Sequence, residues 1–202
     1  MKLRSILRNL FLTAKYMFFR IIRKNKFNDT SPIKLHLGCG KTHLQGWVNI
    51  DVNNFAFADI VCNFMDLRNI YLNDSVSSIK MIHSISYLRL FEARDFFKMC
   101  FDLLIHNGTF ILEFPDIIKC AKIIIENDKK DNEQYIEGVR GFYAFDLNEV
   151  KNKKKYIPYM FGWSAGHIEQ ELIKIGFSNI LISDGEEHNR PWRDTRIEAK
   201  KP

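Results

Sequence analysis

The sequence predicts an α/β fold, a doubly wound and mostly parallel sheet of the Rossmann-like kind. Three observations support it. Apolar strand-like runs alternate with helical patterns from Ile33 onward, the first run ends in Gly38-Cys39-Gly40, and the second ends in Asp51. The chain has 202 residues, of which 46% are hydrophobic, and this is enough for the core of one domain.

Apolar runs bounded by Gly, Pro or Asn predict the strands. They are Ile33–Leu37, Trp47–Val52, Asp59–Asn63, Ile79–Ser84, Thr109–Phe114, Asn179–Ile182 and Arg196–Lys200. Helical spacing predicts helices at Glu92–His106, Ile117–Glu126 and Ser164–Ile175, the last closed by Gly176. The nine residues between Leu37 and Trp47 are short for a parallel crossover, so the first helix should be reduced to about a turn.

The region Gln134–Tyr159 has a poor pattern and includes the lysine-rich run 151–155. It is interpreted as an inserted loop or lid over the carboxyl ends of the strands. A solvated, disordered loop is an equal alternative.

The positive charge of the chain is concentrated at its start. The formal net charge is +6, but residues 1–26 hold eight Lys and Arg and no acid, which leaves 22 basic against 24 acidic residues in the rest. The body therefore has a net charge of −2 and no general attraction for a polyanion, so nucleic acid is not an expected partner.

Residues 1–26 form a predicted basic amphipathic helix, joined by a linker at 27–32 to a domain at 33–202. The helix can lie on an anionic membrane surface or pack on protein, either its own body or a second subunit. An organellar presequence is a weaker alternative. No run of about twenty apolar residues predicts a membrane span.

The expected compartment is the cytoplasm, with peripheral membrane association open. Arg20, Arg23 and Lys24 lie where a signal peptide would need its apolar core and cleavage site, so export is not expected. The four cysteines include no CxxC pair, which favours neither a disulfide framework nor a zinc ribbon, and no metal site is predicted.

The turn Gly38–Gly40 is the strongest functional signal. Glycines at the end of a strand let the backbone approach a ligand closely, and an acid at the end of the next strand can accept hydrogen bonds from ribose hydroxyls. Asp51 lies eleven residues after Gly40, and position 43 is His43, so the dinucleotide fingerprint is absent. A tight turn with a surface aspartate is the alternative.

Residues 35–41 (LHLGCGK) and 46–51 (GWVNID) resemble the opening motif of class I S-adenosylmethionine-dependent methyltransferases. They are most similar to a small type that accompanies surface-polysaccharide biosynthesis, and the resemblance covers nearly everything from Ile33. It implies S-adenosylmethionine as cofactor and assigns roles to these residues: Gly38 and Gly40 under the methionine part, Asp51 on the ribose, and Asp66 and Leu67 beside the adenine. Cys39, within the turn, and His83, after the fourth strand, are further candidates beside the cofactor.

One departure from the resemblance bears on activity. Many relatives carry a Glu-His pair after the fourth strand, whereas Arg89 and Leu90 stand in the corresponding stretch here. A non-catalytic protein that keeps the fold, and docks through its first helix to a membrane or a partner, is therefore the alternative function.

His83, Asp116 and His188 are the candidate catalytic residues. His83 and Asp116 follow predicted strands, where a doubly wound sheet presents its ligands, and either can supply a general base. A residue at a strand end also often caps a turn or helix, and Pro115-Asp116 fits a helix N-cap. His188 with Arg190 and Arg193 can reach an acidic or phosphorylated acceptor, although surface ion pairing is the default for such arginines.

The predicted function is methyl transfer from S-adenosylmethionine to a small molecule or glycan, in particular a sugar hydroxyl in polysaccharide or glycolipid synthesis. The acceptor follows from the resemblance alone. Because the cofactor carries the reactive methyl group, the protein has to supply alignment and proton removal.

Overall fold

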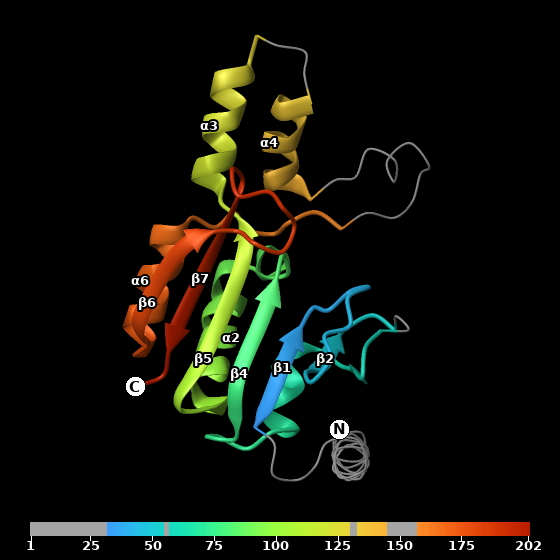
Figure 1. The fold of residues 1–202 in the computed structure, drawn as a ribbon, viewed down its shortest axis with the longest axis vertical. Coiled ribbons are helices and arrows are strands. Elements are labelled where there is room, and N and C mark those ends of the chain that lie inside the picture. Colours follow the sequence, from blue (N-terminus) through green and yellow to red (C-terminus); the bar gives the residue numbers. More distant parts are fainter. Residues whose placement is uncertain (1–31, 55–56, 130–132, 145–156) are drawn as a thin grey trace, which may run out of the picture.

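The computed structural model describes residues 32–54, 57–129, 133–144 and 157–202. Its centre is a seven-stranded sheet with the order β3-β2-β1-β4-β5-β7-β6 (Figure 1). The strands are β1 Ile33–Leu37, β2 Val48–Asp51, β3 Ile60–Val61, β4 Val76–Ile82, β5 Leu104–Pro115, β6 Ser178–Asp184 and β7 Asp194–Lys200. All neighbours from β3 to β5 pair in parallel, and β7 pairs antiparallel with both β5 and β6. The mixed α/β fold is therefore as predicted.

The helices are α2 Leu90–Leu103, α3 Ile117–Asn127, α4 Glu133–Tyr143 and α6 Ala165–Ile175, with short 3₁₀ turns η1 Phe64–Asn69 and η2 Ile85–Tyr87. In Figure 1, α2 and α6 lie behind the sheet, and α3 and α4 form a hairpin that extends beyond the end of β5. At α6, Ser164 caps the first turn and Gly176 ends the helix in the left-handed region at φ 114°, as the sequence predicts.

One face of the sheet carries the hydrophobic core. Neighbouring strands bring Leu35, Ile79, Phe110 and Ala199 side by side, and all four are fully buried. Phe110 meets Phe97 of α2 edge to face, with ring centroids 6.0 Å apart. This row of side chains therefore lies on the face that α2 and α6 cover (Figure 1), and its apolar character lets these helices pack there.

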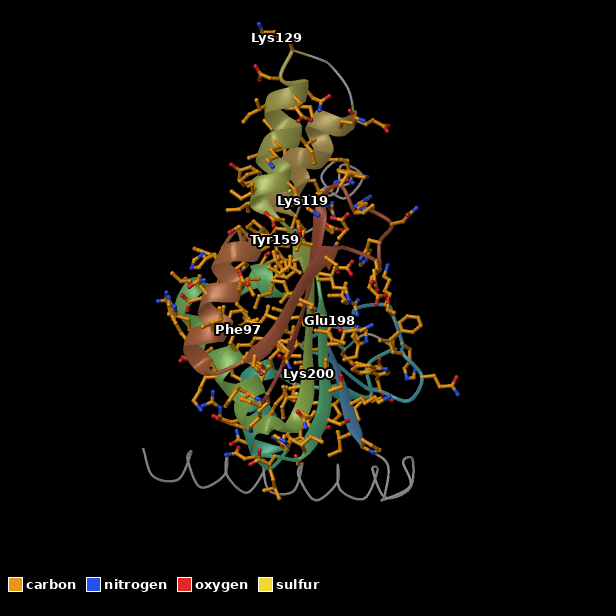
Figure 2. All side chains as sticks on the ribbon, turned by 60° about the vertical axis from the view of Figure 1, so that its left-hand side comes forward. Phe97, Lys119, Lys129, Tyr159, Glu198 and Lys200 are labelled. Atoms are coloured by element: carbon orange, nitrogen blue, oxygen red, sulfur yellow. The ribbon has the colours of Figure 1, made fainter. Side chains whose placement is uncertain are left out.

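The opposite face is polar. The row next to the core row holds His36, Lys80, Ile111 and Glu198. Further along the same face, Lys200 donates to Thr109 Oγ1 at 2.6 Å, and Arg196 donates to Glu198 Oε1 at 2.7 Å. Figure 2 labels Glu198 and Lys200 on β7, together with Phe97 on the helix side.

The strand order agrees with the expected doubly wound arrangement. The strand order reverses beside β1 as such a sheet requires. However, within the described ranges α2 and α6 cover one face only (Figure 1). The side chains of the second face form ion pairs with one another, among them Lys80 with Glu187 and Arg196 with Glu198.

The connection from β1 to β2 holds turns and no helix, so the short crossover is confirmed. The buried side chain of Asn49 stabilises it. Its Oδ1 accepts from Leu44 N at 2.9 Å, and its Nδ2 donates to the carbonyl oxygens of Leu44 and Trp47, at 3.1 Å each, and to Asp59 Oδ2 at 3.0 Å. Side-chain hydrogen bonds thus replace helical packing as the support of this loop.

The prediction of a loop from Gln134 onward is wrong for its first part, which is the helix α4. The helix was not predicted because α4 contains two glycines, and glycine weakens a helical pattern. They serve packing instead: a Cβ on Gly141 would lie 2.2 Å from Cys120 Sγ of α3. Residues 145–156 lie outside the described part of the chain, as do the predicted helix at 1–26 and nearly all of the linker at 27–32.

None of the helices described here is long and apolar enough to cross a membrane.

Replacing Asn49 with Ala should lower the free energy of unfolding by about 3 kcal/mol, because the buried polar groups of the loop would lose their partners. Urea denaturation measures this. Asn73→Ala, at an exposed site, is the matched control and should change stability by no more than about 0.5 kcal/mol. Equal effects of the two substitutions would show that Asn49 does not support the loop.

Candidate functional site

A pocket of about 420 Å³ lies where β1 and β4 end. The turn after β1 forms one wall, the residues after β4 form a second, and Glu187 and His188 of the β6–β7 loop form a third. His36 and Lys80 form the floor from the polar face of the sheet. Residues distant in sequence therefore meet at the carboxyl edge of the sheet, where such folds bind ligands.

The glycine turn is folded back onto β2. Gly38 N and Cys39 N both donate to Ile50 O, at 2.8 and 3.2 Å. Gly38 and Gly40 adopt φ of 66° and 53°, which side chains disfavour. A Cβ on Gly38 would lie 2.1 Å from Ser84 Oγ, whereas a Cβ on Gly40 would meet nothing within 4 Å. Gly38 thus lets the loop after β4 approach, and the open space expected for a ligand lies at Gly40.

Asp51 lies beneath this turn. Its Oδ2 accepts from Gly40 N at 2.9 Å, and its Oδ1 accepts from Asn53 N at 2.8 Å. The residue is 6% exposed and is not part of the pocket lining. Oδ1 accepts a second bond from Asn53 Nδ2 at 3.2 Å, so Oδ2 is the oxygen that can accept a further hydrogen bond. Its ribose role therefore stays a prediction.

The two residues expected beside the adenine lie on η1. Leu67 is fully buried in the hydrophobic core, so only its main chain can border a ligand. Asp66 is half-buried in the first turn of η1. Neither contributes to the pocket lining, and their adenine role stays a prediction.

Cys39 lines the pocket beside the two glycines. Burial raises the pKa of its thiol to about 11, and the nearby Asp51 carboxylate adds to the effect. The thiol is therefore neutral at physiological pH and is not an activated nucleophile.

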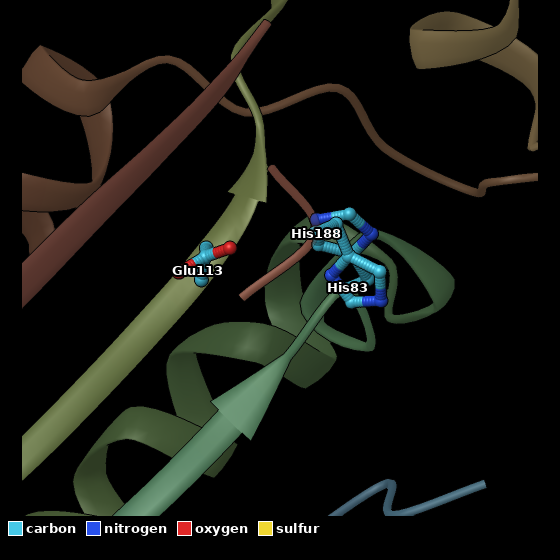
Figure 3. A group of neighbouring side chains, drawn as sticks. All are labelled: His83, Glu113 and His188. Atoms are coloured by element: carbon cyan, nitrogen blue, oxygen red, sulfur yellow. The ribbon is translucent and has the colours of Figure 1, made fainter. Parts of the chain in front are cut away.

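His83 and His188 meet at the pocket. The rings stack with centroids 4.2 Å apart and planes inclined by 20° (Figure 3), and both residues line the pocket. His83 follows β4 with a φ of 55°, and its main-chain N–H donates to Glu113 O at 2.7 Å. A non-glycine residue held in this region often marks a functional position.

Asp194 is a site residue that the sequence analysis missed. Its buried Oδ2 lies 3.0 Å from His83 Nε2, although the two atoms are not aligned as a full hydrogen bond. Arg193 donates to both of its oxygens, at 2.7 and 3.0 Å. Burial alone would raise the pKa of Asp194, but His83 and Arg193 outweigh it and hold the pKa below the usual value. The side chain is thus a carboxylate that faces an imidazole.

The structure gives Asp116 the N-cap role that the sequence also allowed. Its Oδ1 accepts from Ile118 N at 2.8 Å, and its Oδ2 accepts from Ala165 N at 3.0 Å. The residue is buried and is not part of the pocket lining. Because its oxygens join α3 to α6, we do not include Asp116 in the chemistry of the site.

Arg190 and Arg193 are ion-paired. Both lie within 3.5 Å of Glu137 Oε2 on α4, and Arg193 also binds Asp194. Both arginines thus form the ion pairs that the sequence analysis gave as the default, and their charges are balanced by carboxylates of the described chain. Arg89 and Leu90 lie at the start of α2, outside the pocket lining.

His83, Glu113 and His188 each place one potential metal-ligand atom within 4.8 Å of the others (Figure 3). Two features disfavour an ion in this arrangement. The lone pairs of stacked imidazoles do not converge on one point, and both oxygens of Glu113 already accept main-chain hydrogen bonds, from Glu186 at 2.9 Å and Glu187 at 3.0 Å. We therefore assign no ion to this cluster.

The fold is similar to that of several solved structures described as S-adenosylmethionine-dependent methyltransferases. One such enzyme from Methanosarcina mazei has a TM-score of 0.57 at 13% identity, covering 89% of this chain and 96% of that chain. Another, from Archaeoglobus fulgidus, has a TM-score of 0.55 at 12% identity, covering 93% of this chain and 94% of that chain. A Thermotoga maritima protein described as a possible histamine N-methyltransferase has a TM-score of 0.53 at 11% identity, covering 98% of this chain and 95% of that chain. At these identities the likeness concerns the fold.

No protein-family model and no curated protein sequence matches the chain.

Acidification should destabilise the protein through His36 on the pocket floor. Burial lowers the pKa of His36 below 6.5, although a hydrogen bond with Asn49 opposes this. As the pH falls, the unfolded chain therefore binds a proton at His36 before the folded chain does. The stability that neutral, buried His36 allows is fully present above about pH 6.5 and is lost as the pH falls below that value. Urea denaturation should show that the free energy of unfolding falls less between pH 7 and pH 5 in His36→Gln than in the wild type.

His106→Gln, which replaces an exposed histidine, is the matched control. A decline as steep in His36→Gln as in the wild type would exclude this origin.

Proposed function

We propose that this protein transfers the methyl group of S-adenosylmethionine to a hydroxyl of a small-molecule or glycan acceptor. The observation that carries the proposal is one pocket that joins the Gly38–Gly40 turn to His83, which faces the buried Asp194 carboxylate. The fold likeness to methyltransferases supports the cofactor class.

The residues present fit such a cofactor. Open space lies beside Gly40, and the 420 Å³ pocket extends from there to the two histidines. In the proposal, Gly38, Cys39 and Gly40 border the methionine part, Asp51 accepts from the ribose, and Asp66 and Leu67 border the adenine. When bound, the sulfonium supplies an activated methyl group, and the protein contributes positioning, which is worth several kcal/mol.

His83 is the proposed general base. Nε2 lies beside Asp194, so Nδ1 is the nitrogen left to take the proton of an acceptor hydroxyl. Asp194 orients the ring and stabilises the imidazolium that forms, as a buried carboxylate does beside a catalytic histidine. The imperfect alignment of this contact is common in the absence of substrate.

The surroundings of the histidines suit an uncharged acceptor. Tyr87 and Tyr159 meet at a ring distance of 5.0 Å and supply aromatic surface in the pocket. Lys80 on the floor is neutralised by Glu187 at 2.7 Å. We therefore infer a sugar ring as the acceptor class, in keeping with the polysaccharide or glycolipid pathways that the sequence resemblance implies. Membrane association through residues 1–26 stays a prediction from their sequence.

Asp51→Asn should weaken binding of S-adenosylhomocysteine at least about tenfold, because the amide has only one oxygen that can accept a hydrogen bond, whereas the carboxylate has two. Isothermal titration calorimetry gives the dissociation constant. Asp74→Asn, at an exposed acid outside the pocket, is the matched control. Unchanged affinity in Asp51→Asn would refute the assigned cofactor site.

His83→Gln and Asp194→Asn should each lower kcat by about 10²-fold or more, because proton removal is impaired, and should leave cofactor affinity near the wild-type value. The assay follows S-adenosylhomocysteine formation with a panel of neutral sugars and nucleotide sugars, and His106→Gln is the control. Cofactor binding without turnover on any member of the panel would support the non-catalytic alternative.

A further inference from the structure

We propose that Glu113 is a positioning residue that fixes His83 and His188 against each other. The inference deepens the proposed function and rests on it, because the stacked pair includes the proposed base. Glu113 lies on β5 and is fully buried. Neither the sequence pattern nor the proposed chemistry gives it another role.

Glu113 binds the segments that carry both histidines. Its main-chain oxygen accepts the N–H of His83 at 2.7 Å. Its side chain accepts from the β6–β7 loop, with Oε2 taking the N–H of Glu186 at 2.9 Å and Oε1 taking that of Glu187 at 3.0 Å. One residue of the central sheet thus sets the position of the strand end that bears His83 and of the loop that bears His188.

The loop is anchored further on both sides of this contact. Glu187 pairs with Lys80 of β4 at 2.7 Å. A Cβ on Gly185 would lie 2.7 Å from the Cβ of Asp194, so the loop also follows β7 closely at this point. Arg196 Nη1 lies 3.8 Å from Glu113 Oε2 and balances its charge. Both side-chain oxygens of Glu113 therefore accept a hydrogen bond from the loop.

The two acceptor oxygens make the role specific to a carboxylate. Two neighbouring N–H groups of the loop bind the two oxygens of one carboxylate, so the loop cannot pivot about either hydrogen bond. His188, the next residue, therefore stays stacked on the ring of His83. The stack limits His83 to one orientation, the one in which its Nε2 lies beside Asp194. Loss of either N–H contact should free His188 and let the base move.

Glu113→Gln tests this with a small change. The amide keeps one oxygen, and its NH₂ group cannot accept, so one loop N–H loses its partner while the main-chain bond to His83 stays. In the wild type, NMR should show nuclear Overhauser contacts between the ring protons of His83 and His188. In Glu113→Gln these contacts should disappear and kcat should fall at least about tenfold. The dissociation constant of S-adenosylhomocysteine should change less than twofold.

Glu198→Gln is the matched control, because it removes another carboxylate partner of Arg196 without touching the loop. It should keep both the ring contacts and kcat. If Glu113→Gln does not fold, as judged by circular dichroism, Glu186→Pro removes one loop N–H at an exposed position and should have the same effect on the ring contacts.

Unchanged ring contacts in a folded Glu113→Gln or Glu186→Pro variant would overturn the proposal. Lost ring contacts with unchanged kcat would also overturn it, because the positioning would then not matter to the reaction. If the wild type binds cofactor but has no turnover, the proposed function fails, and the ring contacts alone then decide whether Glu113 holds the histidines.

Discussion

The site depends on the way the turn after β1 is folded onto β2. Two consecutive N–H groups, of Gly38 and Cys39, share the carbonyl of Ile50, and the next N–H binds the carboxylate of Asp51. Because a side chain at Gly38 would overlap Ser84, the same turn also sets how closely the loop after β4 can approach. Three strand ends are therefore positioned by one short segment, and the pocket is the space that remains between them.

A second constraint is the alternation of side chains across the sheet. Alternate positions of β1, β4, β5 and β7 are apolar and lie on the side of α2 and α6, whereas the positions between them are mainly polar, among them His36, Lys80, Glu113 and Arg196. These polar rows pair among themselves, and they also supply the site: His36 and Lys80 form the pocket floor, and Glu113 binds the β6–β7 loop. The face without a described helix is thus the face that carries much of the polar chemistry.

Much of the fold follows from local sequence. Every predicted strand is present, and Ser164 and Gly176 delimit α6 as capping rules predict. Two features were not predictable in this way. Helix α4 has a weak pattern because Gly138 and Gly141 serve contact with α3. The polar character of the second face of the sheet depends on how rows of distant strands align. Periodicity within one segment contains neither kind of information.

The site was predictable only in part, for a related reason. His83 and His188 were recognised as candidates and are stacked, but Asp194 and Glu113 were not, because a carboxylate within a strand looks like any other alternating polar position. Asp194 also begins a charged chain that runs through Arg193 to Glu137 on α4. The hairpin of α3 and α4 packs chiefly on itself and lies beyond the strand ends. Its length and outer surface can therefore diverge between relatives at little cost to the sheet, provided that the ion pairs which connect it to Asp194 are kept.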